Sequence, residues 1–316
     1  MKRLTLLRSI LAVMAVVWAM PQQASEDKWW PSRYGADDRL GAYNLLSPEQ
    51  VKKAAKLVKT GKTYSLGIVT GPSTPAYPPR TFVLRVTQND NGTGATFGEN
   101  EASGNDEWML TYMGIGSQLD GLGHAGKSHR FYNGVPAEDF VRPTGLIEFG
   151  IHQLPPLVSR GVLLDMTHGA PEGRLEGGDV FNRKEIDEAA ARQGVQIEEG
   201  DVVLFHTGWM AVSHTDPERF LETEPGLGKE GAEYLAGLGV VAVGADTAAL
   251  EVLPPENPRE AVPVHQILLV HHGVYVLENM NTIELARDRA WEFLFVLGQP
   301  RFEGAAQAII NPVAIR

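Results

Sequence analysis

The residues best suited to chemistry lie in a glycine-rich stretch, GIGSQLDGLGH, at positions 114–124. Gln118 and Asp120 are two positions apart, so their side chains point the same way if the backbone is extended. His124 follows four positions later, past a turn that the glycines allow. Two side-chain oxygens and an imidazole suit a divalent cation with a base beside it. A structural interpretation stays open, in which Asp120 caps a turn and His124 packs in the core.

Three other polar residues stand at the ends of apolar runs. Asp246 follows VVAVGA, His265 precedes QILLV, and Glu278 follows VYVL. Strand ends in α/β sheets are where sites gather, and a buried acid there needs a cation, a proton or several donors. Asp120, His265 and Glu278 would together form a site for one ion, with positions left for water. The spacing alone does not establish that these three residues converge.

The elements that must position these residues mix strands and helices without strict alternation. Ser47-Pro48-Glu49-Gln50 has the pattern of a capping box and predicts the start of a helix that Gly61 ends. Apolar periodicity predicts strands at 63–69, 81–87, 108–115, 161–166, 201–206, 240–243, 274–277 and 292–297, and helices at 182–193, 229–238 and 265–272. This mixture predicts an α/β or α+β fold with a mixed sheet and flanking helices, rather than a barrel of eight repeats.

Composition and charge exclude several classes of function. The chain has 316 residues and a formal net charge of −11, so its surface repels phosphates and we expect no nucleic-acid partner. The absence of cysteine excludes a thiol nucleophile, disulfides and cysteine zinc sites. GLGKEG at 226–231 spells a dinucleotide fingerprint, but it follows Thr-Glu-Pro rather than a predicted strand, so we interpret it as a loop that enters a helix.

Residues 1–25 have the order of a secretory signal peptide. A basic start with Lys2 and Arg3 leads into the apolar run 10–20, and polar and small residues follow. The run is short for a bilayer core of about 30 Å, although an uncleaved membrane anchor is the alternative. We expect a periplasmic or secreted protein that has no membrane contact after cleavage, with a single catalytic domain at 26–316.

Segment 114–124 resembles the motif H-x-G-T-H-x-D-x-P-x-H of the cyclase family of metal-dependent hydrolases, which includes bacterial kynurenine formamidase and isatin hydrolase. Gly116, Ser117, Asp120 and His124 fall in register on four motif positions. Other segments that keep the family's order are GVLLD at 161–165, GDVVL at 200–204, TGW at 207–209, GADT at 244–247, His265, and EN at 278–279. The segment YGADD at 34–38 resembles a long-form secreted branch.

The resemblance implies a swivelling β/β/α fold, a homodimer or homotetramer, and hydrolysis of a small-molecule amide, or less favourably of an ester or lactone. It implies that Asp120, His265 and Glu278 bind a divalent ion, zinc or manganese. His124 would exchange protons with water and the leaving group, and Tyr77 would form an aromatic substrate wall. We expect either Asp246 or Thr247 to contact the ring nitrogen of His265 that does not face the ion and so to orient the imidazole.

Three positions depart from the family motif. Gly114 and Gln118 stand where the motif has histidines, and Leu122 stands where it has proline. Because glycine has no side chain to bind a metal, we expect one ion rather than two, with Gln118 as a neutral oxygen ligand or as a substrate donor. Two alternatives stay open: an ion-free member of the fold that binds a small metabolite, and a lyase or isomerase that uses His124 without net hydrolysis.

Overall fold

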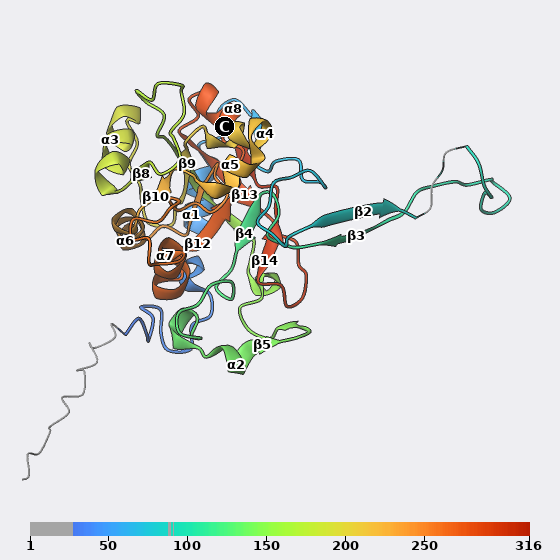
Figure 1. The fold of residues 1–316 in the computed structure, drawn as a ribbon, viewed down its shortest axis with the longest axis horizontal. Helices are drawn as coiled ribbons and strands as arrows, with labels where there is room; N and C mark the ends of the chain where they lie inside the picture. The colour runs from blue at the N-terminus through green and yellow to red at the C-terminus, as the bar shows by residue number, and fades with distance from the viewer. Residues whose placement is uncertain (1–27, 88–89, 91) are drawn as a thin grey trace, which may run out of the picture.

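The computed structural model describes residues 28–87, 90 and 92–316, so the predicted signal peptide lies outside the described residues. Figure 1 shows a body built around one large sheet, from which a hairpin projects as an arm. The strands of the hairpin are β2 (Phe82–Val86) and β3 (Glu107–Thr111). Among the helices of the described residues, none has the length and apolar character needed to cross a bilayer.

The large sheet has nine strands in the order β1-β15-β13-β7-β9-β11-β12-β4-β14. Its strands are β1 (Thr63–Ser65), β4 (Gln118–Asp120), β7 (Leu157–Asp165), β9 (Val202–His206), β11 (Ala242–Ala245), β12 (Tyr275–Glu278), β13 (Glu292–Leu297), β14 (Gln307–Ile309) and β15 (Val313–Ile315). The central strands β7, β9, β11 and β12 run parallel, and the strands on both sides of them pair antiparallel. The prediction of an α/β fold with a mixed sheet is confirmed.

Short helices surround this sheet. The α-helices are α1 (Pro48–Ala55), α2 (Ala137–Phe140), α3 (Arg183–Gln193), α4 (Val212–Thr215), α5 (Pro217–Glu222), α6 (Lys229–Leu238), α7 (Pro263–His265) and α8 (Ile283–Arg287). A π-helix, Gln266–His272, continues α7, and 3₁₀ helices lie at Gly41–Leu45, Tyr132–Gly134, Ile151–Gln153 and Trp209–Ala211. The predicted capping box of Ser47 and Gln50 is confirmed at the start of α1. Small two-stranded sheets pair β5 (Val141–Arg142) with β6 (Gly145–Leu146), and β8 (Val180–Phe181) with β10 (Gly226–Leu227).

The core lies along the parallel strands. Their residues form nearly continuous apolar runs, as expected for strands that are covered on both faces. Helices α1 and α3 pack against β7, and α6 packs against the π-helix. The central strands are therefore a rigid base on which side chains at their ends can be held.

The predicted strand at 108–115 is wrong in its extent. Strand β3 ends at Thr111, and the separate short strand β4 begins at Gln118, inside the large sheet. The chain turns between them at Gly116, whose φ of +71° disfavours other residues and whose missing side chain leaves room for Thr70. This turn moves the chain from the arm into the sheet, where β4 pairs with β12 and β14.

Candidate metal centre

Three adjacent strands bring the candidate residues onto one face of the sheet. In the register of β4 with β12, Gln118 lies opposite Glu278, and in the register of β4 with β14, Asp120 lies opposite Gln307. Residues directly opposite each other project from the same face, as do residues two apart on one strand. The expectation that Gln118 and Asp120 point the same way is confirmed, because the Gln118 Nε2 lies 3.3 Å from Asp120 Oδ1.

Asp120 is fully buried at the centre of this group. Its Oδ1 accepts a hydrogen bond of 2.7 Å from Gln307 Nε2. Its Oδ2 has no hydrogen-bond partner and lies 3.8 Å from His124 Nε2 and 3.6 Å from His265 Nε2. Asp120, His124 and His265 each offer one possible ligand atom, and these three atoms lie within 4.8 Å of one another. A buried carboxylate oxygen between two imidazole nitrogens has the chemistry of a divalent metal site.

His265 is oriented by Glu251. Its Nδ1 lies 2.5 Å from Glu251 Oε1, and the same carboxylate accepts the backbone N–H groups of Val264 and His265 at 3.2 and 3.3 Å. Its Nε2 lies 3.1 Å from Glu278 Oε1. Because Nδ1 is engaged by Glu251, Nε2 is the nitrogen that faces Asp120 and Glu278.

The expectation that Asp246 or Thr247 orients His265 is wrong. The Asp246 carboxylate accepts the backbone N–H groups of Thr207 and Gly208, and it also faces His206 Nδ1 at 3.3 Å. Asp246 thus ties the end of β9 to the end of β11 and is not available to His265. Sequence order alone could not distinguish Asp246 from Glu251, because both follow the same strand.

Burial and neighbouring charges set the protonation of the site. Burial would raise the pKa of Asp120, but His124 and His265 hold it below its ordinary value. For His265, burial opposes the charge, but the neighbouring Asp120, Glu251 and Glu278 carboxylates hold its pKa well above the ordinary value. Burial and then the Asp120 charge raise the pKa of Glu278 to about 7. The site therefore holds exchangeable protons near neutral pH that a cation would displace.

Gln118 lies between the two carboxylates. Its Nε2 donates a hydrogen bond of 2.5 Å to Glu278 Oε2 and faces Asp120, while its Oε1 is buried and has no hydrogen-bond partner. In this orientation the side chain donates to the carboxylates through nitrogen. Its unpartnered oxygen is the atom that could bind a cation or accept a hydrogen bond from a substrate.

His124 is the most exposed member of the group. Its side chain is 25% exposed, against 5% for His265 and 0% for Asp120. Burial lowers the pKa of His124; the Asp120 charge opposes this shift, and the His265 and Arg80 charges add to it. A neutral imidazole with access to solvent can accept a proton from water.

Sequence reasoning missed Arg80, Gln307 and Glu251 at this site. Arg80 Nη1 donates a hydrogen bond of 2.6 Å to the Gly114 carbonyl oxygen, and a Cβ at Gly114 would lie 2.8 Å from that nitrogen. The guanidinium group thus occupies the space that a side chain at position 114 would need. The only sequence signal for Arg80 is its place after the rigid Pro78-Pro79 pair in the loop that carries Tyr77.

Tyr77 packs at the edge of the site against the cluster of Trp209, Met210, Val212, Phe220 and Ala248. Its hydroxyl is buried and has no hydrogen-bond partner. Burial, followed by the Glu224 and Glu278 charges, raises the pKa of Tyr77, so the hydroxyl lies within the field of the site carboxylates. The structure thus gives Tyr77 a packing role, and the substrate wall stays a prediction.

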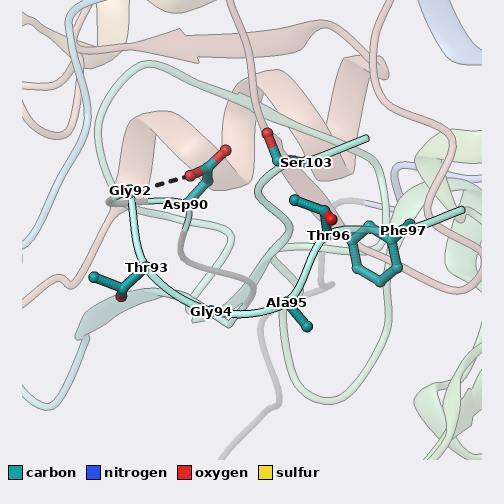
Figure 2. A pocket seen from close by; sticks show the side chains of 9 residues that line it. Asp90, Gly92, Thr93, Gly94, Ala95, Thr96, Phe97 and Ser103 are labelled. Atoms are coloured by element: carbon teal, nitrogen blue, oxygen red, sulfur yellow. Dashed lines mark hydrogen bonds between the residues drawn. The ribbon is translucent and has the colours of Figure 1, made fainter. Parts of the chain in front are cut away.

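A separate hollow lies in the loop at the end of the arm (Figure 2). Small and polar residues and Phe97 line it, and Gly92 N–H donates a hydrogen bond of 3.2 Å to Asp90 Oδ1. Asp90 is the only carboxylate in this lining, which contains no histidine. The hollow therefore has no group of ligands comparable with that around Asp120.

Comparison with known proteins places the chain in a family. The Cyclase family model, described as "Putative cyclase", matches residues 64–252. The crystal structure of a novel cyclase is similar, with 29% identity, a TM-score of 0.82, and coverage of 90% of this chain and 98% of that chain.

More distant structures share the fold. An isatin hydrolase bound to the product analogue thioisatinate has 18% identity and a TM-score of 0.61, over 85% of this chain and 98% of that chain. A predicted metal-dependent hydrolase from Bacillus stearothermophilus has 19% identity and a TM-score of 0.52, over 80% and 97%. No curated protein matches the sequence. Because the family model covers more than half of its residues, this chain belongs to the cyclase family.

Proposed function

We propose that this protein is a metal-dependent hydrolase of a small cyclic or N-acyl amide, with a lactone or ester as the less favoured substrate. The observation that carries the proposal is the buried Asp120 Oδ2, which has no hydrogen-bond partner and lies between the imidazole nitrogens of His124 and His265. The proposal is supported by the names of similar structures, which include metal-dependent hydrolases and isatin hydrolases.

Asp120, His265 and Glu278 would hold one divalent ion. A set of two carboxylates and one imidazole suits zinc or manganese. When bound, such an ion polarises a carbonyl group and lowers the pKa of a water ligand to about 7. Gln307 and Gln118 donate hydrogen bonds to the carboxylates and keep them in position. Glu251 holds His265 in the orientation that binding requires.

His124 would move the proton in the reaction. Hydrolysis adds one water across the C–N bond: the oxygen forms a bond to the carbonyl carbon, and the leaving nitrogen takes a proton. His124 accepts a proton from water and returns it to the leaving group, because its pKa is low enough for the imidazole to be neutral at pH 7. Its greater exposure places it where a substrate can reach it.

A second assignment makes His124 a third ligand to the ion. This is favoured by the short distances between the ligand atoms of Asp120, His124 and His265. Glu278, whose pKa is raised to about 7, would then be the group that exchanges the proton. Replacement of His124 distinguishes the two assignments, because only the second predicts loss of the metal.

The function can be tested with purified protein. Metal content is measured first, and the protein is then stripped with a chelator and reloaded with zinc, manganese or no metal. Each form is assayed against N-formyl aromatic amines, cyclic amides and lactones, with Asp120→Asn as the control. We expect metal-dependent formation of products whose summed mass exceeds that of the substrate by one water. Turnover without any metal would contradict the metal dependence, and products whose summed mass equals that of the substrate would contradict hydrolysis and favour the lyase or isomerase.

A further inference from the structure

Two buried oxygen atoms of the candidate site have no hydrogen-bond partner, and they require different partners. One is Oδ2 of Asp120, whose negative charge favours a cation. The other is Oε1 of Gln118, an uncharged amide oxygen on a side chain that is only 1% exposed. A buried acceptor without a donor is costly, and native structures seldom keep one that no ligand or water reaches. The Gln118 oxygen is therefore suited to a donor that enters the site from outside the chain.

The orientation of the Gln118 amide is fixed by the carboxylates beside it. Its Nε2 lies 3.3 Å from Asp120 Oδ1 and 2.5 Å from Glu278 Oε2. An amide nitrogen donates to carboxylate oxygens, whereas an amide oxygen in the same place would be repelled by both ionised groups. The nitrogen therefore has to face the two carboxylates, and Oε1 has to face away from these two oxygens.

A cation and Gln118 would use different oxygens of the two carboxylates. The Nε2 atom of His265 lies 3.6 Å from Asp120 Oδ2 and 3.1 Å from Glu278 Oε1. These two oxygens and the imidazole nitrogen form a set of donor atoms that suits a divalent ion. Gln118 contacts the other oxygen of each carboxylate, so its amide supports this donor set without belonging to it. The Gln118 Oε1 is thus left for a neutral donor rather than for the ion.

We propose that Gln118 Oε1 accepts a hydrogen bond from the N–H group of the scissile amide, and that the site thereby selects substrates whose amide nitrogen carries a hydrogen. This inference rests on the proposed function, because it concerns the same site and the same substrate. The carbonyl and N–H groups of an amide belong to one planar unit, so a substrate whose carbonyl lies beside Asp120 brings its N–H group close to the neighbouring Gln118. An ester, a lactone or an N-alkyl amide has no donor at that position.

Gln307 provides the matched control, because it shares one task with Gln118 but not the other. Its Nε2 donates a hydrogen bond of 2.7 Å to Asp120 Oδ1, the same oxygen that Gln118 faces. Within the part of the chain that the structure describes, its amide oxygen is not among the buried atoms without a partner. Replacement of either glutamine by methionine therefore removes support from Asp120, but only Gln118→Met removes the buried acceptor.

Binding of matched ligands tests the proposal without turnover. The ligands are oxindole and valerolactam, their N-methyl derivatives, and the cyclic ketones in which CH₂ replaces N–H and removes the donor without adding bulk. Calorimetry on the metal-free wild type should give about 10- to 100-fold tighter binding for the N–H form than for either replacement. In Gln118→Met this preference should fall to about twofold or less, because the acceptor is gone, whereas Gln307→Met should keep it.

Hydrolysis by the metal-loaded protein gives a second measurement. The ratio of kcat/KM for each N–H amide to that for its N-methyl derivative should fall in Gln118→Met and should be kept in Gln307→Met. Loss of metal affects both members of a pair alike and cancels in this ratio. Circular dichroism of both variants checks that they are folded.

Four results would overturn the assignment of Gln118. Equal binding of the N–H and ketone forms by the wild type, or no binding of any ligand, would leave a water molecule as the partner of Oε1. A preference that disappears when metal is loaded would mean that the ion holds Oε1, and a preference lost in Gln307→Met but kept in Gln118→Met would assign the acceptor to Gln307. Binding that prefers N–H without any hydrolysis would instead contradict the proposed hydrolase and support Oε1 as the acceptor.

Discussion

The Nδ1 atom of His265 lies 2.5 Å from Oε1 of Glu251, and both side chains are buried. Glu251 also accepts the first backbone N–H groups of the helix that carries His265, where an anion is favoured by the helix dipole. One carboxylate therefore fixes both the start of the helix and the orientation of the imidazole ring. As a result, Nε2 is directed toward Asp120 and Glu278, which lie on strands.

Replacement of Glu251 by glutamine should weaken metal binding. Glutamine keeps the volume but removes the charge that holds the Nδ1 proton of His265, so metal affinity should fall by about 10- to 100-fold. Competition with a fluorescent chelator measures this change. The matched control is Glu260→Gln, which removes the half-buried carboxylate partner of Lys229, outside the candidate site, and should leave the affinity unchanged. Equal affinities for Glu251→Gln and the wild type would show that Glu251 does not position His265.

Replacement of His124 by alanine should show whether this residue binds the metal or exchanges the proton during turnover. If His124 exchanges the proton, the variant should keep its metal while turnover falls by about 10²- to 10⁴-fold. Asp120→Ala should lose both metal and turnover, because Asp120 provides the central oxygen of the site. Metal analysis and single-substrate kinetics measure the two properties on the same samples.

The exposed His129 provides the control for this series, and His129→Ala should behave as the wild type. Full activity of His124→Ala would contradict the acid–base assignment. Loss of metal from His124→Ala would support the second assignment, in which His124 is a ligand.

Much of the fold could be predicted because its longer elements are encoded locally. Helix α6 (Lys229–Leu238) and strand β13 (Glu292–Leu297) have the predicted bounds, since apolar periodicity and the αL glycine after α6 determine them. The short strands β14 and β15 have three residues each, and no local pattern predicts them. They exist because they pair with the distant strands β4 and β1, respectively.

In the candidate site, too, residues with a local sequence signal could be predicted, and residues placed by long-range pairing could not. Asp120 could be proposed from the glycine-rich stretch at 114–124, and His265 and Glu278 from their places at the ends of apolar runs; the structure brings these three together. Gln307 could not be proposed, because its contact with Asp120 depends on the register of β14 with β4 across 187 positions. Arg80 could not be proposed either, because its contact with Gly114 is made between two loops.

Metal affinity should increase with pH through neutrality and beyond it. In the metal-free protein, burial and the Asp120 charge raise the pKa of Glu278 to about 7, so below this pH the carboxyl group carries a proton that a cation must displace. The affinity should rise about tenfold per pH unit for each proton released, and because His265, whose pKa is held well above its ordinary value, must also lose a proton to bind through Nε2, the rise should continue above pH 7. Calorimetry in two buffers of different ionisation enthalpy counts the protons. Glu278→Gln should flatten this dependence, and an affinity that falls as pH rises would contradict it.

Replacement of Arg80 by methionine should shift the pH dependence of turnover. Burial lowers the pKa of His124, and the His265 and Arg80 charges lower it further, so loss of the Arg80 charge should raise that pKa. If neutral His124 is the base, the acidic limb of the kcat/KM profile should move to higher pH, while the plateau at high pH is kept. Arg80→Lys retains a positive charge and should leave the limb close to its wild-type position. A limb that moves equally in both variants would mean that the geometry of the guanidinium beside Gly114, rather than its charge, controls His124.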